Sequence, residues 1–345
     1  GEYAKARDHY EAAQKFYKET KNERGESMAL NSLGSLLVEQ GLYRQARSYF
    51  EQSLALKRKI GHRRAEHITL ENLGVVADKL GRYVEARQYL EQVKRFTSDM
   101  DDQESYAAVL LSLSTVSIHM GDFPRAQTEL EQAQALFRET GIRFSECLAL
   151  IALGQLALHR GNLQAAQLHS QEALAMAQDL NMRREQRDAR LVLGRALLGL
   201  GQAAAALETY QKALDGSLEL WDPGQVLASR AGLALAYRLD GNLEQAVQAI
   251  QPILAQLYVE SRTKSAEISL EALEGIEEPL WVLLACCQIL EEAADPRSVQ
   301  LLDTAYRLMQ ARAELLGDGG LQRTFLAIPI HQEISERWQK TAWQV

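Results

Sequence analysis

A forty-residue repeat constrains this chain more than any other feature of its sequence. Glycine recurs at that spacing from the first residue onwards, and alanine follows each glycine after five positions. The glycines are Gly1, Gly41, Gly81, Gly121, Gly161, Gly201 and Gly241, and the alanines are Ala6, Ala46, Ala86, Ala126, Ala166, Ala206 and Ala246. A period of this length is typical of repeat architectures, in which each unit buries its apolar face against its neighbours. We therefore expect an elongated array rather than two or three separate globular domains.

Each forty-residue row contains two segments with helical periodicity. The segment that opens a row, such as GLYRQARSYFEQSLALKRKIG, carries apolar residues at helical spacing. It ends near Gly61, whose position is taken in later rows by Gly141 and Asn181, and both residue types accept the left-handed conformation that ends helices. The segment that closes a row, such as AEHITLENLGVVADKL, is again helical and ends at Gly81. A single glycine between two helices predicts a tight antiparallel hairpin.

Two short motifs in these rows carry a family resemblance. Leucine followed by a small residue, as in Leu33-Gly34, marks the closing helices, and Gly-x-Tyr-x-x-Ala marks the start of the opening ones. Together they resemble the tetratricopeptide repeat signature, in its long, forty-residue form. The resemblance implies an all-α, right-handed α-solenoid of antiparallel helix pairs, with about eight repeats and a C-terminal capping helix. In the order of the family the Leu-Gly helix comes first in each pair, so the chain is expected to begin at a second helix.

The regular array is expected to cover residues 1–260. Pro252 lies inside its last helix and is expected to kink or shorten that helix. Residues 261–276 are polar and predict an irregular connection, and residues 277–316 predict a divergent, tetratricopeptide-like helix pair. Three glycines, Gly317, Gly319 and Gly320, are expected to end this pair.

Residues 321–345 are expected to form the C-terminal cap, as a helix broken near Pro329, because an array needs a terminal unit with one polar face. The sequence from EEPLWVLLACC to LQRTFLAIPIHQEI resembles the end of bacterial multidomain signalling ATPase regulators of the STAND type. In such regulators a nucleotide-binding switch domain precedes a tetratricopeptide sensor array. The resemblance implies that this chain is the sensor or scaffold arm and that upstream domains of the same polypeptide are partners. The chain itself contains no G-x-x-x-x-G-K-[ST] loop and no DNA-binding motif.

Charge and cysteine content narrow the function classes. The formal net charge is −8, which argues against direct nucleic-acid binding, although residues 1–100 have a small excess of basic side chains. Cys147, Cys286 and Cys287 are odd in number and lie in apolar runs, so we expect buried free thiols and a cytoplasmic location. The sequence contains no run of about 18 apolar residues, so it predicts no membrane-spanning helix. No secretory signal pattern opens the chain.

The residues that could carry chemistry form no recognisable catalytic or metal site. The seven histidines include no HExxH motif, and His62 and His67 are five positions apart, so they point to different sides of a helix. We therefore expect no catalytic residues, no metal and no cofactor. Two basic clusters, KRKIGHRR at 57–64 and RREQRDAR at 183–190, are either solvated faces paired with nearby acids or docking points for an acidic partner.

A binding site is expected on the inner, concave face, which the first helix of each pair lines in the family. Positions two before and two after the Leu33 position share one side of that helix, and further positions continue the same face. The candidate groove residues are Asn31, Ser35, Glu71, Val75, Asp78, Leu111, Thr115, Ile118, Ile151, Gln155, Leu158, Leu191, Arg195, Leu198, Leu235 and Arg238. The middle rows are mostly apolar and the end rows polar, a pattern that suits an amphipathic or extended segment.

These observations favour a non-catalytic binding protein. The first hypothesis is the ligand-sensing or partner-docking arm of a bacterial signalling or transcriptional regulator, with a peptide, a protein segment or a small inducer in the groove. The alternatives are a constitutive adaptor, a targeting or regulatory arm of an enzyme such as a protease or cyclase, and an array trimmed or engineered for structural work. As a test, Ile151→Glu is expected to abolish binding while leaving thermal stability nearly unchanged.

Overall fold

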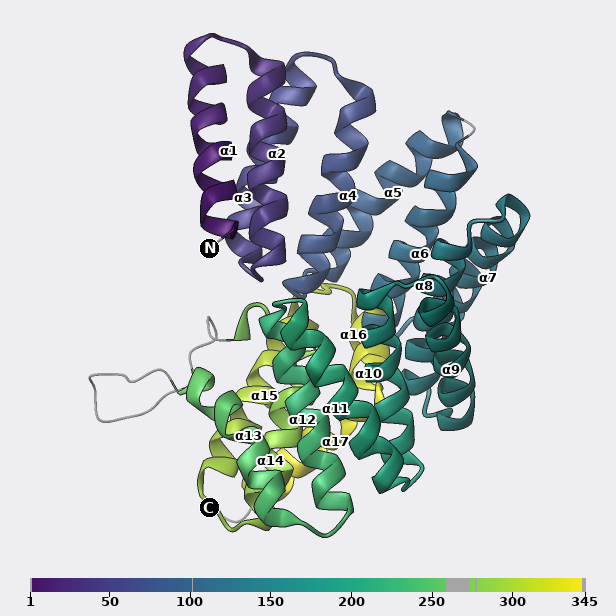
Figure 1. The fold of residues 1–345 in the computed structure, drawn as a ribbon, viewed down its shortest axis with the longest axis vertical. Helices are drawn as coiled ribbons and strands as arrows, with labels where there is room; N and C mark the ends of the chain where they lie inside the picture. The colour runs from purple at the N-terminus through teal and green to yellow at the C-terminus, as the bar shows by residue number, and fades with distance from the viewer. Residues whose placement is uncertain (1, 101, 259–267, 269–272, 277, 343–345) are drawn as a thin grey trace.

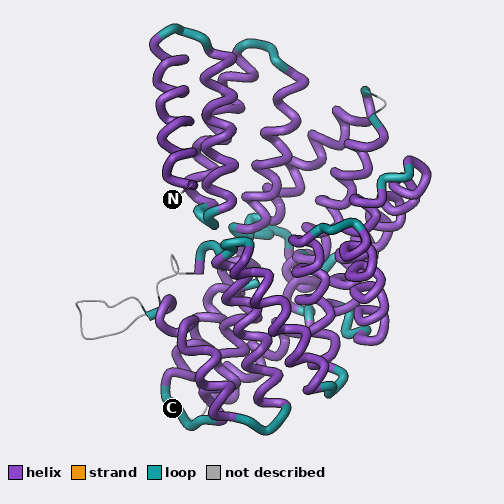
Figure 2. Tube along the Cα trace, in the orientation of Figure 1, coloured by secondary structure: helices purple, strands orange, loops and turns teal. Residues whose placement is uncertain are grey.

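The computed structural model describes residues 2–100, 102–258, 268, 273–276 and 278–342, and every regular element in them is a helix (Figures 1 and 2). Helices alternate along the rows and turn back at each glycine, which confirms the predicted all-α solenoid of antiparallel pairs. The row helices are α1 (Glu2–Glu19), α2 (Glu23–Glu39), α3 (Tyr43–Lys59), α4 (Arg63–Lys79), α5 (Tyr83–Asp99), α6 (Gln103–His119), α7 (Phe123–Thr140), α8 (Arg143–His159), α9 (Leu163–Asp179), α10 (Arg183–Gly199), α11 (Ala203–Glu219), α12 (Pro223–Leu239) and α13 (Leu243–Leu257).

The helix boundaries follow the turn residues that the sequence predicts. Gly41 and Gly121 have φ angles of 73° and 76°, so each adopts the left-handed conformation that ends a helix. Asn181 takes the same conformation in the turn between α9 and α10, with φ 55°. The prediction for Pro252 is also confirmed, because α13 contains 15 residues whereas α12 contains 17. Local sequence is therefore sufficient to set where the row helices begin and end.

The small residues of the rows permit close contact between helices. The ring of Tyr210 on α11 is fully buried between Gly194 of α10 and Gly232 of α12. A β-carbon added at Gly194 would lie 2.7 Å from the ring, and one added at Gly232 would lie only 2.0 Å from Tyr210 Cε1. These two glycines let three successive helices enclose one large aromatic side chain, so their small size is a packing requirement.

Gly232→Ala is expected to lower the free energy of unfolding by about 2–3 kcal/mol, because the added methyl group overpacks a filled core. Gly216→Ala is the matched control in α11, since the nearest atom to its added β-carbon is Arg187 Cβ at 3.7 Å. We expect Gly216→Ala to raise stability by up to about 1 kcal/mol through helix propensity. Urea unfolding measures both changes. A loss of the same size in the two variants would show that Tyr210 is not the cause.

Four further helices form the C-terminal region: α14 (Pro279–Glu292), α15 (Arg297–Glu314), α16 (Gly319–Leu326) and α17 (Pro329–Ala342). The predicted break near Pro329 is confirmed by the boundary between α16 and α17. The prediction for the three glycines is correct only for Gly317, which has φ 69°. Gly319 and Gly320 instead begin α16, because the Asp318 carboxylate caps that helix by accepting a hydrogen bond from the Gly320 backbone N–H at 2.7 Å. The expected connection at 261–276 lies largely outside the described residues.

The C-terminal helices do more than cap the end of the array. Figure 1 shows the array curling, so that α1–α4 lie above the helices from the other end of the chain. Three successive row-opening turns contact this C-terminal region. The Gly41 turn meets Gly275, the Gly81 turn meets Arg312, and the Gly121 turn meets Thr324.

Side-chain contacts close the curl further. Arg312 Nη1 donates to the Tyr83 hydroxyl at 3.1 Å, and the Thr324 hydroxyl donates to the Met120 carbonyl at 3.2 Å. A further long-range contact joins the array to itself, since Arg184 of α10 forms an ion pair with Glu39 of α2 at 2.8 Å. The solenoid therefore makes a nearly closed ring, and its C-terminal helices lie against the inner face.

The three cysteines lie in the part of the chain that the structure describes. Cys147, Cys286 and Cys287 are all free and buried, as predicted. Burial raises the pKa of Cys147 and of Cys287 to about 11, so both stay protonated near neutral pH. Within the described residues, none of the helices has the length and apolar character that crossing a bilayer requires.

Candidate functional site

The concave face holds a cavity of about 350 Å³, here called the central cavity. The first helices α6, α8, α10 and α12 supply its walls, and Glu278 and Trp281 at the start of α14 close one side. Six of the predicted groove residues line it, namely Leu111, Thr115, Ile151, Gln155, Leu191 and Arg195. Its surface is thus mixed, with leucine and isoleucine walls beside amide, hydroxyl, guanidinium, ammonium and carboxylate groups. Such a surface suits a ligand with both apolar side chains and backbone or side-chain polar groups.

A second cavity, the lower cavity, has a volume of about 360 Å³ and lies farther along the same helices. Four more predicted residues line it, namely Leu158, Leu198, Leu235 and Arg238, and Arg195 borders both cavities. Its opposite wall comes from α14 and α17, through residues such as Leu284 and Ile330. The C-terminal helices therefore divide the expected single groove into two compartments.

The remaining predicted residues lie away from both compartments. Ser35 and Val75 are exposed on α2 and α4, and Glu71 is half-buried on α4, where burial raises its pKa. Ile118 is only 1 % exposed and packs in the core beside α7. Asn31 and Asp78 make contacts inside the array, Asn31 with Thr69 and Asp78 with His119. The structure thus gathers ten of the sixteen residues around the two cavities.

Asn31 is occupied by contacts within the array. Its side-chain carbonyl accepts a hydrogen bond from the Thr69 hydroxyl at 2.9 Å and a longer one from Lys57 Nζ at 3.4 Å. Lys57 also donates to the Thr69 hydroxyl at 2.5 Å. Burial lowers the pKa of Lys57 to about 8. This network joins α2, α3 and α4, so Asn31 has a structural role here.

The stability expectation for Ile151→Glu has to be revised. Ile151 lines the central cavity, but only 6 % of it is exposed, and it packs in a core cluster with Cys147 and Val192. A glutamate there would bury a charge, so a large loss of stability is expected together with any loss of binding. Leu111 and Leu191 are half-buried and line the same cavity, which makes them better probes of the groove.

The residues that border the central and lower cavities form one polar cluster. The Arg195 guanidinium on α10 pairs with the Glu278 carboxylate, and the Trp281 ring covers Arg195 at 5.0 Å from its centroid. Trp281 in turn stacks on Tyr210, with ring centroids 6.5 Å apart and an angle of 21° between planes. Sequence reasoning found Arg195 but missed the other three residues. Glu278 and Trp281 belong to residues 277–316, where the forty-residue register is lost, so the repeat could not place them on the inner face.

A smaller cavity of about 70 Å³, here called the histidine cavity, lies where α4, α6 and α8 meet the C-terminal helices. His119, His159 and His331 line it together with Asp78. The Asp78 carboxylate contacts His119 Nδ1 at 2.7 Å, and His331 Nδ1 donates to the Phe325 carbonyl at 2.6 Å. A signal for part of this cluster was available, since His119 and His159 occupy the same position in consecutive rows.

Burial and one carboxylate shift the pKa values of these histidines in opposite directions. Burial lowers the pKa of His159 to about 3 and that of His331 to about 4, so both are neutral near pH 7. Burial also acts to lower the pKa of His119, but the facing Asp78 outweighs it and raises that pKa. The pKa of Asp78 is lowered by His119, although burial alone would raise it. The cavity therefore combines a histidine–carboxylate pair with two neutral imidazoles.

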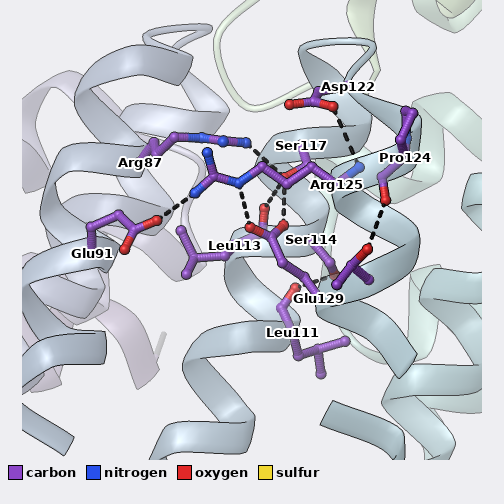
Figure 3. Close-up of polar contacts among 11 residues, drawn as sticks. Arg87, Glu91, Leu111, Leu113, Ser114, Ser117, Asp122, Pro124, Arg125 and Glu129 are labelled. Carbon is purple, nitrogen blue, oxygen red and sulfur yellow. Dashed lines mark hydrogen bonds and ion pairs between the residues drawn. The ribbon is translucent and has the colours of Figure 1, made fainter. Parts of the chain in front are cut away.

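Figure 3 shows the polar contacts that hold α6 against its neighbouring helices. The Ser117 hydroxyl of α6 donates to buried Glu129 of α7 at 2.5 Å, and Arg87 of α5 donates to the same hydroxyl at 2.7 Å. Arg125 forms an ion pair with Glu129 at 2.9 Å. These contacts link three consecutive helices and so fix the helix that carries Leu111 into the central cavity.

The two basic clusters are largely paired with groups of the same chain. Lys57 in the first cluster is committed to the buried network with Asn31 and Thr69. Arg187 in the second cluster is buried and forms ion pairs with Asp188 and Asp222, each at 2.8 Å. This arrangement favours structural roles over docking of an acidic partner. Across the described residues, no group of three or more histidine, cysteine or acidic side chains has the geometry to hold a metal ion.

Comparison of the sequence with models of known protein families identifies one family. Two family models, both described as tetratricopeptide repeat, match the sequence. One matches residues 1–59, 26–99 and 101–179, and the other matches residues 151–219. A comparison with curated proteins finds no match.

Several solved structures share the fold. The Rap conjugation gene regulator of the plasmid pLS20, in complex with the Phr* peptide, has a TM-score of 0.66 at 13% identity and covers 88% of this chain and 79% of its own. A Rap protein complexed with competence and sporulation factor has a TM-score of 0.55 at 13% identity, covering 98% and 99%. A signal transduction ATPase with numerous domains and a tetratricopeptide repeat sensor, from Pyrococcus horikoshii, has a TM-score of 0.50 at 18% identity. The match covers 91% of this chain but 46% of that protein.

Proposed function

The chain belongs to the tetratricopeptide repeat family, and from that premise we propose that it is a non-catalytic scaffold whose central cavity binds a peptide or an extended protein segment. The central cavity is the observation that carries this proposal. It combines apolar walls at Leu111 and Leu191 with the amide of Gln155, and it opens on the concave face. Apolar walls provide contact area, and the polar groups orient a backbone.

We further propose that the chain is the ligand-sensing or partner-docking arm of a bacterial signalling or transcriptional regulator that acts in the cytoplasm. The fold shared with a Rap regulator bound to a peptide supports this assignment, as does the fold shared with the sensor of a signalling ATPase. The buried free thiols agree with a reducing compartment. A constitutive adaptor would use the same cavity without a switch. An arm of a protease or cyclase would use it to recruit a substrate or regulator.

The proposal is tested by selecting peptides on the immobilised chain from a phage-displayed library of random heptapeptides. Selected peptides are then made with a fluorescent label, and their affinities are measured by fluorescence polarisation. Leu191→Glu is expected to weaken their binding at least about tenfold, because it places a charge on the apolar wall of the central cavity.

Leu168→Glu serves as the matched control, since Leu168 is 54 % exposed on the second helix α9 and lines neither cavity. It should leave the affinities unchanged. If both variants bind the peptides as the parent chain does, or if the library yields no peptide, the central cavity is not a peptide site.

A further inference from the structure

Glu278 adopts an unusual conformation at the edge of the central cavity. Its φ of 48° lies in the left-handed region, which residues with a β-carbon rarely occupy. It stands directly before α14, but its side chain makes no capping hydrogen bond to that helix. Instead, the carboxylate pairs with Arg195 on α10. The backbone is thus held in an unfavourable conformation that delivers a carboxylate to the inner face, and such strain is often found at functional sites.

The Arg195–Glu278 pair lies where the three cavities meet. Arg195 lines the central and lower cavities, Glu278 lines the central and histidine cavities, and Trp281 lines all three. Trp281 covers the Arg195 guanidinium, so this cation is held in one place between an aromatic face and a carboxylate. A ligand that fills the central cavity must therefore contact this ion pair or replace one of its members.

A second polar group at the same place has no partner. Tyr210 is fully buried and its side chain lines the central cavity. Its hydroxyl forms no hydrogen bond with any of the described residues. The Tyr210 ring stacks on Trp281, and Trp281 also covers Arg195, so Tyr210 belongs to the same cluster. A buried hydroxyl without a partner is costly, and a ligand oxygen in the cavity would satisfy it.

We propose that Arg195 and the Tyr210 hydroxyl form a carboxylate-binding subsite of the central cavity, that Glu278 occupies its cation in this structure, and that an acidic side chain of a bound peptide displaces Glu278. This inference rests on the proposed function and names the chemistry of its ligand. Glu278 itself demonstrates that a carboxylate fits against Arg195. The apolar walls at Ile151 and Leu191 then select aspartate or glutamate flanked by apolar residues.

Displacement of Glu278 would also regulate how tightly the central cavity binds its ligand. Only chains in which the Arg195–Glu278 pair is broken can accept the ligand carboxylate. The apparent affinity is therefore the intrinsic affinity multiplied by the fraction of such chains. Ligand binding would release Glu278 and with it the start of α14. Because α14 packs against α12 and α15, the C-terminal helices are the element that such a release would move.

The test uses heptapeptides selected on the Glu278→Gln variant, in which glutamine keeps the size of the side chain but removes its charge. We expect the selected peptides to contain aspartate or glutamate and to bind this variant at least about tenfold tighter than the parent chain. Each peptide is compared with its Gln or Asn analogue, which should bind both proteins equally weakly. Amidated and free C-termini are compared as well, so that a side-chain carboxylate is distinguished from a terminal one.

Two further variants identify the groups that bind the carboxylate. Adding Arg195→Met to Glu278→Gln is expected to abolish the preference for acidic peptides. Tyr210→Phe in the same background should reduce it several-fold without lowering stability, because it removes only an unpartnered hydroxyl. Urea unfolding of every variant verifies that the fold is kept.

The outcomes separate this inference from the proposed function. Peptides that lack acidic residues, bind all these variants equally and are lost on Leu191→Glu would overturn the carboxylate subsite and leave the peptide site standing. A requirement for the free C-terminus would replace the side-chain assignment. If no heptapeptide binds either the parent chain or Glu278→Gln, both proposals fail.

Discussion

Gly121→Ala is expected to lower the free energy of unfolding by about 3–4 kcal/mol, more than any other single methyl group added to a row-opening turn. Two costs add together at this position. Gly121 has φ 76°, and alanine in the left-handed region costs about 1–2 kcal/mol. In addition, the new β-carbon would lie 2.4 Å from the Thr324 carbonyl oxygen, so the C-terminal half of α16 would have to move. Backbone atoms cannot rotate away as a flexible side chain can.

Gly161→Ala is the matched control for this prediction. Gly161 occupies the same position in the next row and has a φ of 75°, but a β-carbon added there meets nothing within 4 Å. We expect it to cost only the conformational part, about 1–2 kcal/mol. Urea unfolding followed by circular dichroism and by tryptophan fluorescence measures both. Equal losses in the two variants would contradict a firm docking of α16 on the Gly121 turn.

Acidification from about pH 6.5 to about pH 5 is expected to lower the free energy of unfolding by about 3 kcal/mol. His159 and His331 have folded-state pKa values of about 3 and about 4, well below the ordinary value of 6.5. A histidine whose pKa is lowered by folding contributes stability above its unfolded pKa, and this contribution is lost as the pH falls towards the folded pKa. At pH 5 each loses about 2 kcal/mol, and the partial exposure of His159 reduces its share.

Other groups around the histidine cavity act outside this pH window. His119 has a raised pKa, so its contribution is complete below 6.5 and is lost as the pH rises through its folded pKa. Asp78 and Glu278 have lowered pKa values, so their contributions persist until the pH falls below their ordinary values near 4. The stability contributed by these groups should therefore still be rising at pH 6.5 and reach its maximum above that pH.

His159→Gln is the variant that checks this assignment. Because it removes the histidine with the smaller share, the loss of stability between pH 6.5 and pH 5 should fall from about 3 to about 2 kcal/mol. Urea unfolding at constant ionic strength measures the slope. An unchanged slope in the variant would show that carboxylates or exposed histidines cause the acid sensitivity instead.

The nearly closed ring has a consequence for any ligand of the concave face. In an open solenoid the first helices would present one continuous groove, as the sequence predicts. Here α14 and α17 border that groove, and Trp281 separates its two compartments. A long helical partner would have to displace the C-terminal helices, whereas a short extended segment fits the central cavity alone. The C-terminal region thus sets the length of ligand that the array can accept.

The candidate site was only partly predictable. Leu111, Gln155, Leu191 and Arg195 were found because the repeat places them on one face of successive first helices. Ile118 and Asn31 occupy equivalent positions, but they are buried or engaged inside the array. The repeat pattern shows which side of a helix a residue is on. It does not show whether a neighbouring helix covers that side.

The sequence by itself determined the repeat unit, the helix boundaries and the solenoid. These features depend on residues close in the chain: a glycine at each turn, and a small residue wherever two consecutive helices touch. Only the tertiary structure decided that Gly41, Gly81 and Gly121 are covered by the C-terminal region while Gly161, Gly201 and Gly241 stay open. The contacts responsible join residues 204 and 229 positions apart. The small curvature that each row adds brings such distant residues together, and no local pattern encodes that sum.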